Sequence, residues 1–139
     1  MSERENTQLV QQAYRDFQNG DIPALLDALS EDVEWVVPEV EGVPGEGVPG
    51  RGTWRGPEQV GEFFRILSDT QEPRQIELRE FVAQGDKVVV LGHYIWHVKA
   101  TGKEWESDFV HALSVRDGKM TRFQEYTDTA AFGDAFREG

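Results

Sequence analysis

Cysteine is absent from the 139 residues of this chain. The chain therefore holds no disulfide framework, no Cys–zinc site and no thiol nucleophile. Histidine is scarce as well, with only His93, His97 and His111. Two ligands four residues apart on a strand lie about 13 Å apart along it, which is too far for one ion. We therefore expect neither a metal nor a cofactor.

Long hydrophobic runs and basic residues are also scarce. No apolar stretch approaches the ~18 residues of a membrane span, and the opening MSERENTQ is polar where a signal peptide has its apolar core. Lysine and arginine number 14 against 26 acidic residues, which gives a net charge of −12 at pH 7. Such a charge repels phosphate backbones and anionic lipid. We expect a cytoplasmic protein that binds neither nucleic acid nor membranes.

Apolar and aromatic residues are what the chain has in quantity. Hydrophobic residues make up 38% of the sequence, including 8 Phe, 4 Trp and 3 Tyr. This is too much for a disordered chain. The length is that of one globular domain, so residues 1–139 are predicted to share a single core.

The first segment predicts two helices in a hairpin and then a strand. Its apolar residues recur at helical spacing and share one face: Leu9, Val10, Ala13, Tyr14 and Phe17. A capping box of Ser2 and Glu5 precedes this helix, and Asp21 caps the next one. Alternation then predicts a strand over 33–37, which stops at Pro38.

Residues 38–56 are rich in glycine and proline, and GVPGE (42–46) is nearly repeated as GVPGR (47–51). Such a composition predicts a long loop, which is either a tolerated surface insertion or a lid over a pocket. Trp54 and Arg55 near its end slightly favour the lid.

The second half predicts one helix and then an antiparallel meander. Pro57 begins the helix. Four β-rich segments follow, at 74–84, 87–98, 104–115 and 119–128. Thr101-Gly102 and Asp117-Gly118 supply the turns between the last three of them. Residues 129–136 add a terminal helical turn capped by Asp128. The order ααβαββββ predicts an α+β fold without a dinucleotide fingerprint.

Three motifs carry a resemblance to a known superfamily. They are Asn19-Gly20-Asp21-Ile22, the Arg55 to Val60 stretch RGPEQV, and Asp117-Gly118-Lys119-Met120 followed by Glu125-Tyr126-Thr127-Asp128. In this order they resemble nuclear transport factor 2, ketosteroid isomerase, limonene epoxide hydrolase and the SnoaL-type polyketide cyclases. The resemblance implies a cone-shaped, curved antiparallel sheet with a mixed edge, wrapped around three helices of the N-terminal half. It also implies an internal apolar pocket for a small hydrophobic molecule.

Two members of this superfamily suggest different site residues. Aligned on ketosteroid isomerase, the general-base carboxylate falls at Val37 and the oxyanion-hole tyrosine at Ala13, next to Tyr14. A valine cannot move a proton, so ketosteroid isomerase chemistry by that base is not expected. Aligned on the SnoaL-type cyclases, the catalytic histidine corresponds to His111 and the acid to Glu125, a glutamate where that family has aspartate.

Strand parity supports the same pair. His111 shares the inward face of its strand with Phe109, and Glu125 shares one with Phe123. A three-residue loop at Asp117-Gly118 would set residues 111 and 125 opposite each other, with Cβ atoms about 5 Å apart. A two-residue loop would set Gln124 opposite instead.

The neighbouring hairpin at Thr101-Gly102 would place Tyr94 opposite Phe109. It would also place Gly92 opposite His111, where a glycine leaves room for a ligand. The residues expected to line the pocket are Phe17, Trp35, Val37, Trp54, Phe63, Tyr94, Trp96, Phe109 and Phe123.

Acid–base catalysis without a cofactor is the leading functional interpretation. Glu125 would take an acidic proton next to a carbonyl, while His111 or Tyr14 stabilises the enolate oxygen. Two alternatives stay open. The pair orients a ligand in a non-catalytic binding or carrier domain, or it is a buried hydrogen bond that satisfies two polar groups.

The opposite face of the strand at 87–98 is too apolar to face water alone. It predicts a homodimer through sheet packing. The residues of this outer face are Val89, Leu91, His93, Ile95 and His97.

Overall fold

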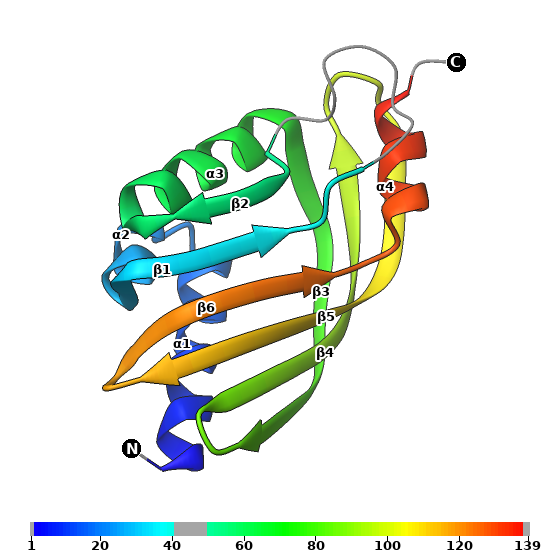
Figure 1. Cartoon of the computed structure of the whole chain (residues 1–139). Coiled ribbons are helices and arrows are strands. Elements are labelled where there is room, and N and C mark those ends of the chain that lie inside the picture. Colours follow the sequence, from blue (N-terminus) through cyan, green and yellow to red (C-terminus); the bar gives the residue numbers. More distant parts are fainter. Residues whose placement is uncertain (1, 41–49, 138–139) are drawn as a thin grey trace.

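A curved six-stranded sheet wraps around α1 and α3 in the computed structural model, which describes residues 2–40 and 50–137 (Figure 1). The helices are α1 (Glu3–Gln18), α2 (Ile22–Asp27), α3 (Gly56–Thr70) and α4 (Thr129–Phe136). The strands are β1 (Leu29–Val37), β2 (Gly52–Arg55), β3 (Gln71–Gln84), β4 (Lys87–Val98), β5 (Glu104–Arg116) and β6 (Lys119–Tyr126). The α+β fold expected from the sequence is confirmed.

Side-chain caps fix the helix starts that the sequence predicts. Ser2 and Glu5 form the complete capping box of α1. Asp21 and Asp128 each accept a hydrogen bond from the backbone N–H three residues further on, at the starts of α2 and α4. Because these caps satisfy N–H groups that a helix leaves free at its first turn, they determine where α1, α2 and α4 begin.

The strand order is β2-β1-β6-β5-β4-β3. Among the described strands, β1 and β6 pair in parallel and the other neighbours are antiparallel. This is the mixed edge implied by the superfamily resemblance. Along the long strands β4 and β5, buried side chains alternate with half-buried or exposed ones. One face of the sheet therefore lines the interior and the other faces outward.

The predicted loop over 38–56 is wrong at its C-terminal end. Residues 52–55 form β2, which pairs with β1 so that Trp54 lies opposite Trp35 and Gly52 opposite Val37. Four residues are too few for an alternation of apolar and polar residues to be recognised in the sequence. As an edge strand, β2 pairs with a neighbour on one side only. Most of the near-repeat over 42–51 lies in residues 41–49, outside the described residues. The question of whether this loop is a surface insertion or a lid falls there too.

The β5–β6 turn combines both registers that the sequence left open. It is a two-residue turn, with Arg116 paired to Lys119, and Asp117 and Gly118 both have positive φ (51° and 74°). These values are typical of a type I′ hairpin. A β-bulge then shifts the pairing by one residue between Ser114 and Val115. His111 therefore lies opposite Glu125 despite the short turn.

The β4–β5 register differs from the expected one by two residues. The turn is centred one residue earlier than Thr101-Gly102, because Val98 donates a backbone hydrogen bond to Lys103. Gly92 consequently lies opposite Phe109, and Val90 lies opposite His111. A Cβ atom at Gly92 would be 2.5 Å from the Phe109 ring and 2.3 Å from a backbone oxygen. The missing side chain thus makes room for Phe109 rather than for a ligand.

Candidate active site

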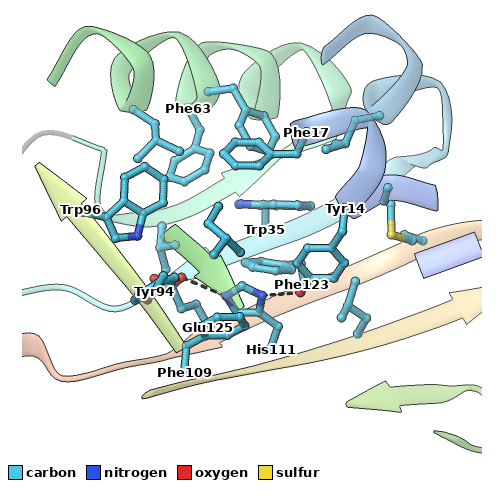
Figure 2. A pocket seen from close by; sticks show the side chains of 18 residues that line it. Tyr14, Phe17, Trp35, Phe63, Tyr94, Trp96, Phe109, His111, Phe123 and Glu125 are labelled. Atoms are coloured by element: carbon cyan, nitrogen blue, oxygen red, sulfur yellow. Dashed lines mark hydrogen bonds and ion pairs between the residues drawn. The ribbon is translucent and has the colours of Figure 1, made fainter. Parts of the chain in front are cut away.

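An apolar cavity with a free volume of about 100 Å³ lies between the concave face of the sheet and the helices. Figure 2 shows its lining side chains, half of which are Phe, Tyr or Trp. Five of them also line an adjacent open groove of about 480 Å³, and so mark the boundary between cavity and solvent: Phe17, Phe64, Leu67, Ile76 and Trp96. Because the cavity and the groove share these residues, a ligand larger than the cavity would extend into the groove.

The structure places eight of the nine predicted lining residues at the cavity: Phe17, Trp35, Val37, Phe63, Tyr94, Trp96, Phe109 and Phe123. Trp54 is the exception. It stands on the edge strand β2, where its ring packs on Phe63 with centroids 6.0 Å apart, and it is not among the lining residues. Val37 is buried in the cavity wall, so the position that corresponds to the ketosteroid isomerase base carries an aliphatic side chain.

Tyr14, His111 and Glu125 form one hydrogen-bonded chain at the cavity wall, drawn as dashed lines in Figure 2. Each comes from a different element: α1, β5 and β6. His111 Nδ1 is hydrogen-bonded to the Tyr14 hydroxyl, and His111 Nε2 lies 3.0 Å from Glu125 Oε2. The side chains of His111 and Glu125 are only 9% and 13% exposed.

The hydrogen-bonding capacities determine the direction of this chain. An ionised carboxylate only accepts, so Nε2 of His111 carries the proton that is donated to Glu125. In the neutral imidazole Nδ1 is then the acceptor, and the Tyr14 hydroxyl donates to it. The three groups thus link a hydroxyl proton to a carboxylate through one imidazole.

Tyr94 extends the chain on the far side of Glu125. Its hydroxyl lies 3.2 Å from Glu125 Oε2 and 2.8 Å from the Thr127 hydroxyl. Oε2 therefore receives hydrogen bonds from both His111 and Tyr94. Among the residues that the structure describes, the other carboxylate oxygen, Oε1, forms no hydrogen bond.

Arg51 is a site residue that the sequence analysis missed. Its guanidinium Nη1 lies 3.7 Å from Glu125 Oε1, and its side chain is only 10% exposed. The guanidinium also lies over the ring of Phe132 in α4, 4.3 Å from the centroid. A lone arginine at the end of a Gly/Pro-rich segment gives no signal in sequence that it is buried beside a carboxylate.

Burial and charge adjust the acidity of these groups in opposite directions. Burial raises the pKa of Glu125, but the hydrogen bond and charge of His111 and the charge of Arg51 outweigh it, so the pKa lies below its usual value. Burial and the nearby charge of Glu125 raise the pKa of Tyr14 and of Tyr94. Near neutral pH Glu125 is therefore an anion, and both tyrosines are protonated donors.

Other kinds of site find no support in residues 2–40 and 50–137. Within these ranges no three His, Asp or Glu side chains gather in a way that would hold a metal ion. Nor does any helix there have the length and apolarity needed to cross a membrane.

Comparison with known proteins agrees with the fold. A family model of the SnoaL-like domain matches residues 10–123. The chain belongs to this SnoaL-like family. No protein of curated function matches it.

Three solved structures illustrate the likeness. An NTF2-like protein from Burkholderia xenovorans LB400 is 35% identical over 99% of both chains, with a TM-score of 0.84. One of unknown function from Burkholderia pseudomallei K96243 is 32% identical over 95% of both chains, with a TM-score of 0.80. TerC, co-crystallised with polyporic acid, is 35% identical over 94% of this chain and 97% of its own, with a TM-score of 0.74.

Proposed function

We propose that this protein is a cofactor-free enzyme that transfers a proton at a carbon next to a carbonyl group in a small aromatic compound. The observation that carries the proposal is the chain Tyr14–His111–Glu125 in the wall of an otherwise apolar cavity. A buried carboxylate held as an anion beside an imidazole and a guanidinium is a suitable general base. The apolar lining favours an aromatic substrate and excludes water from the reacting groups.

In the proposed step, Glu125 accepts the proton as the substrate C–H bond breaks. The electron pair of that bond moves onto the carbonyl oxygen and gives an enolate. To donate a hydrogen bond to this oxygen, the Tyr14 hydroxyl turns its one proton away from His111 Nδ1, and its raised pKa keeps it protonated for that role. Return of a proton from protonated Glu125 to carbon, with His111 holding the carboxyl in place, completes an isomerisation. In a ring closure the enolate carbon instead attacks a second carbonyl group of the substrate, and protonated Glu125 gives its proton to the oxygen of that group.

Trp35 supports an oxygen-bearing ligand. It lines the cavity, and its indole N–H is buried with no acceptor among the residues that the structure describes. A buried donor without a partner is costly, so a ligand oxygen that accepts this hydrogen bond would gain affinity. Polyporic acid, the ligand co-crystallised with TerC, is an aromatic quinone with such oxygens, and we propose compounds of this kind as ligands here.

Deuterium exchange tests the chemistry. The wild-type protein is expected to speed the incorporation of deuterium from D2O into 2-tetralone, an aromatic ketone with an acidic α-proton, as followed by NMR. E125Q should lose this activity while binding polyporic acid as well as the wild type does, measured by quenching of tryptophan fluorescence. If the wild type binds but never accelerates exchange, the non-catalytic carrier is the better description.

The Trp35 hydrogen bond has a matched control. W35F keeps an aromatic ring in the wall but removes the donor, and we expect about tenfold weaker binding of polyporic acid, which corresponds to one hydrogen bond. W54F removes an equally buried and unpartnered indole N–H that does not line the cavity, and it should leave affinity unchanged. Equal affinities of W35F and wild type would remove Trp35 from the binding site.

We further propose that the chain forms a homodimer through the outer face of β4. Val89, Leu91 and Ile95 lie there with half-buried side chains, and His93 and His97 interrupt them. An apolar row of this kind on an antiparallel sheet is stabilised when a second copy covers it.

A further inference from the structure

Arg51 takes no part in the proton-transfer steps above, yet it is buried beside the carboxylate that carries them out. Its side chain is 10% exposed, and it lies at the start of the segment that leads into β2. A guanidinium that leaves water loses strong hydration, which must be replaced by a charge or by hydrogen bonds. The contacts of Arg51 show which replacement it has.

Two groups enclose the guanidinium. The Phe132 ring lies on one side, 4.3 Å from the guanidinium carbon, and Phe132 is itself only 1% exposed in α4. On another side Nη1 faces Glu125 Oε1 at 3.7 Å, a distance too long for a hydrogen bond. Nε is buried without a partner in the part of the chain that the structure describes. Arg51 therefore acts on Glu125 as a charge, while Phe132 holds it in place.

Glu125 meets a different kind of group at each oxygen. Oε2 accepts from His111 of β5 and Tyr94 of β4, and these hydrogen bonds fix its direction. Oε1 lies 3.7 Å from Arg51 Nη1 and accepts no hydrogen bond from the described residues. Tyr14 reaches the carboxylate through His111. Arg51 is also not among the residues that line the cavity, so any effect on a substrate passes through Glu125.

We propose that Arg51 is a positioning residue that keeps Glu125 ionised inside the apolar wall and leaves Oε1 free of hydrogen bonds, ready to accept a proton. This role rests on the proposed function of Glu125 as the general base. Burial alone would favour the neutral carboxyl, and a cation about 4 Å away in a poorly screened interior opposes that tendency. The lowered pKa of Glu125, to which the charge of Arg51 contributes, agrees with this role.

The test compares two arginines four residues apart. R51M removes the buried charge and keeps an unbranched apolar stem over Phe132. R55M removes an exposed charge, since the Arg55 side chain is 66% exposed and pairs with Glu34 at 2.9 Å. The Glu125 carboxyl is titrated in each full-length variant by carbon-13 NMR without any substrate, and E125Q assigns its signal.

We expect the titration midpoint of Glu125 to rise in R51M, to stay close to the wild-type value in R51K and to be unchanged in R55M. In the exchange assay the acid limb of kcat/KM should move upward with that midpoint. If the midpoint rises by about one pH unit, activity on the acid limb should fall about tenfold. Turnover should recover at high pH, which a merely misfolded variant would not do.

A Glu125 midpoint in R51M that is equal to or below the wild-type value overturns the inference. If R51M does not fold, R51Q is titrated and judged by the same criterion. A raised midpoint in a protein that never catalyses exchange leaves the Arg51 inference intact and rejects the proposed function. The two failures are thus distinguishable.

Discussion

Each face of the sheet carries a histidine paired with at least one carboxylate, and the two pairings differ in burial and in the groups around them. On the outer face His93 lies 2.8 Å from both Asp108 and Glu106, which is closer than the 3.0 Å between His111 and Glu125 inside. Yet Asp108 is 79% exposed and Glu125 only 13%. Water screens the outer pair, whereas the inner pair is buried in the wall of an apolar cavity.

This difference shows that a short His–carboxylate distance does not by itself define a site. The inner pair also has a phenol at the far nitrogen of the imidazole, a second phenol at the carboxylate and a buried cation nearby. The outer pair has surface partners, among them Arg79, which is 3.2 Å from Asp108. Four predictions test the contrast, from the largest expected effect to the smallest.

Removing the inner carboxylate should abolish most of the activity. E125Q is expected to lower the rate of deuterium exchange into 2-tetralone by about 10²–10⁴-fold, the usual contribution of a general base. D108N, which changes the outer carboxylate in the same way, should leave the rate unchanged. A comparable loss in both variants would mean that burial does not distinguish the two pairs.

Adjacent residues of β5 should differ strongly in their effect on stability. Phe109 is 2% exposed and packs on Tyr94 and His111, so Phe109→Ala should lower the free energy of unfolding by about 3–5 kcal/mol. Asp108 points outward, so Asp108→Ala should change it little. Urea denaturation of both variants measures the difference, and similar midpoints would contradict the inward and outward assignment.

The pH dependence of stability should have opposite signs on the two faces. The pKa of Glu125 is lowered in the folded protein, so its stabilising contribution is present above the unfolded value of about 4.3 and lost as pH falls through the folded one. The free-energy difference between wild type and E125Q should therefore shrink in acid.

His93 has the reverse behaviour. Hydrogen bonds to Asp108 and Glu106 raise its pKa, so its contribution is present below the unfolded value of about 6.5 and lost as pH rises through the folded one. Urea denaturation of E125Q and H93Q against wild type across pH checks both signs. A gap for H93Q that grows as pH rises would contradict the assignment.

The outer face should matter for assembly alone. Leu91→Glu places a charge in the middle of the proposed dimer face and is expected to give a monomer by sedimentation equilibrium, with the exchange rate per chain preserved. A wild-type protein that is already monomeric at the same concentration would reject the dimer.

Much of the site could be predicted because strand parity is a local property. Alternation along β5 places His111 on the same face as Phe109, and the resemblance to SnoaL-type cyclases suggested Glu125 as its partner. Pairing across the turn is less local. A single bulge decides it, since Met120 and Phe123 are both buried although they are three residues apart. Nothing in the composition of those residues indicates the bulge.

The amino-acid sequence by itself determined the helices and their caps, the strands of the meander and the face on which each candidate side chain lies. These follow from interactions within a few residues. The tertiary structure decided that Gly92 makes room for Phe109, that residues 52–55 become an edge strand, and that Arg51 is buried beside Glu125. Each of these depends on segments that meet only when the sheet curves around the helices, and on the low dielectric that their packing creates.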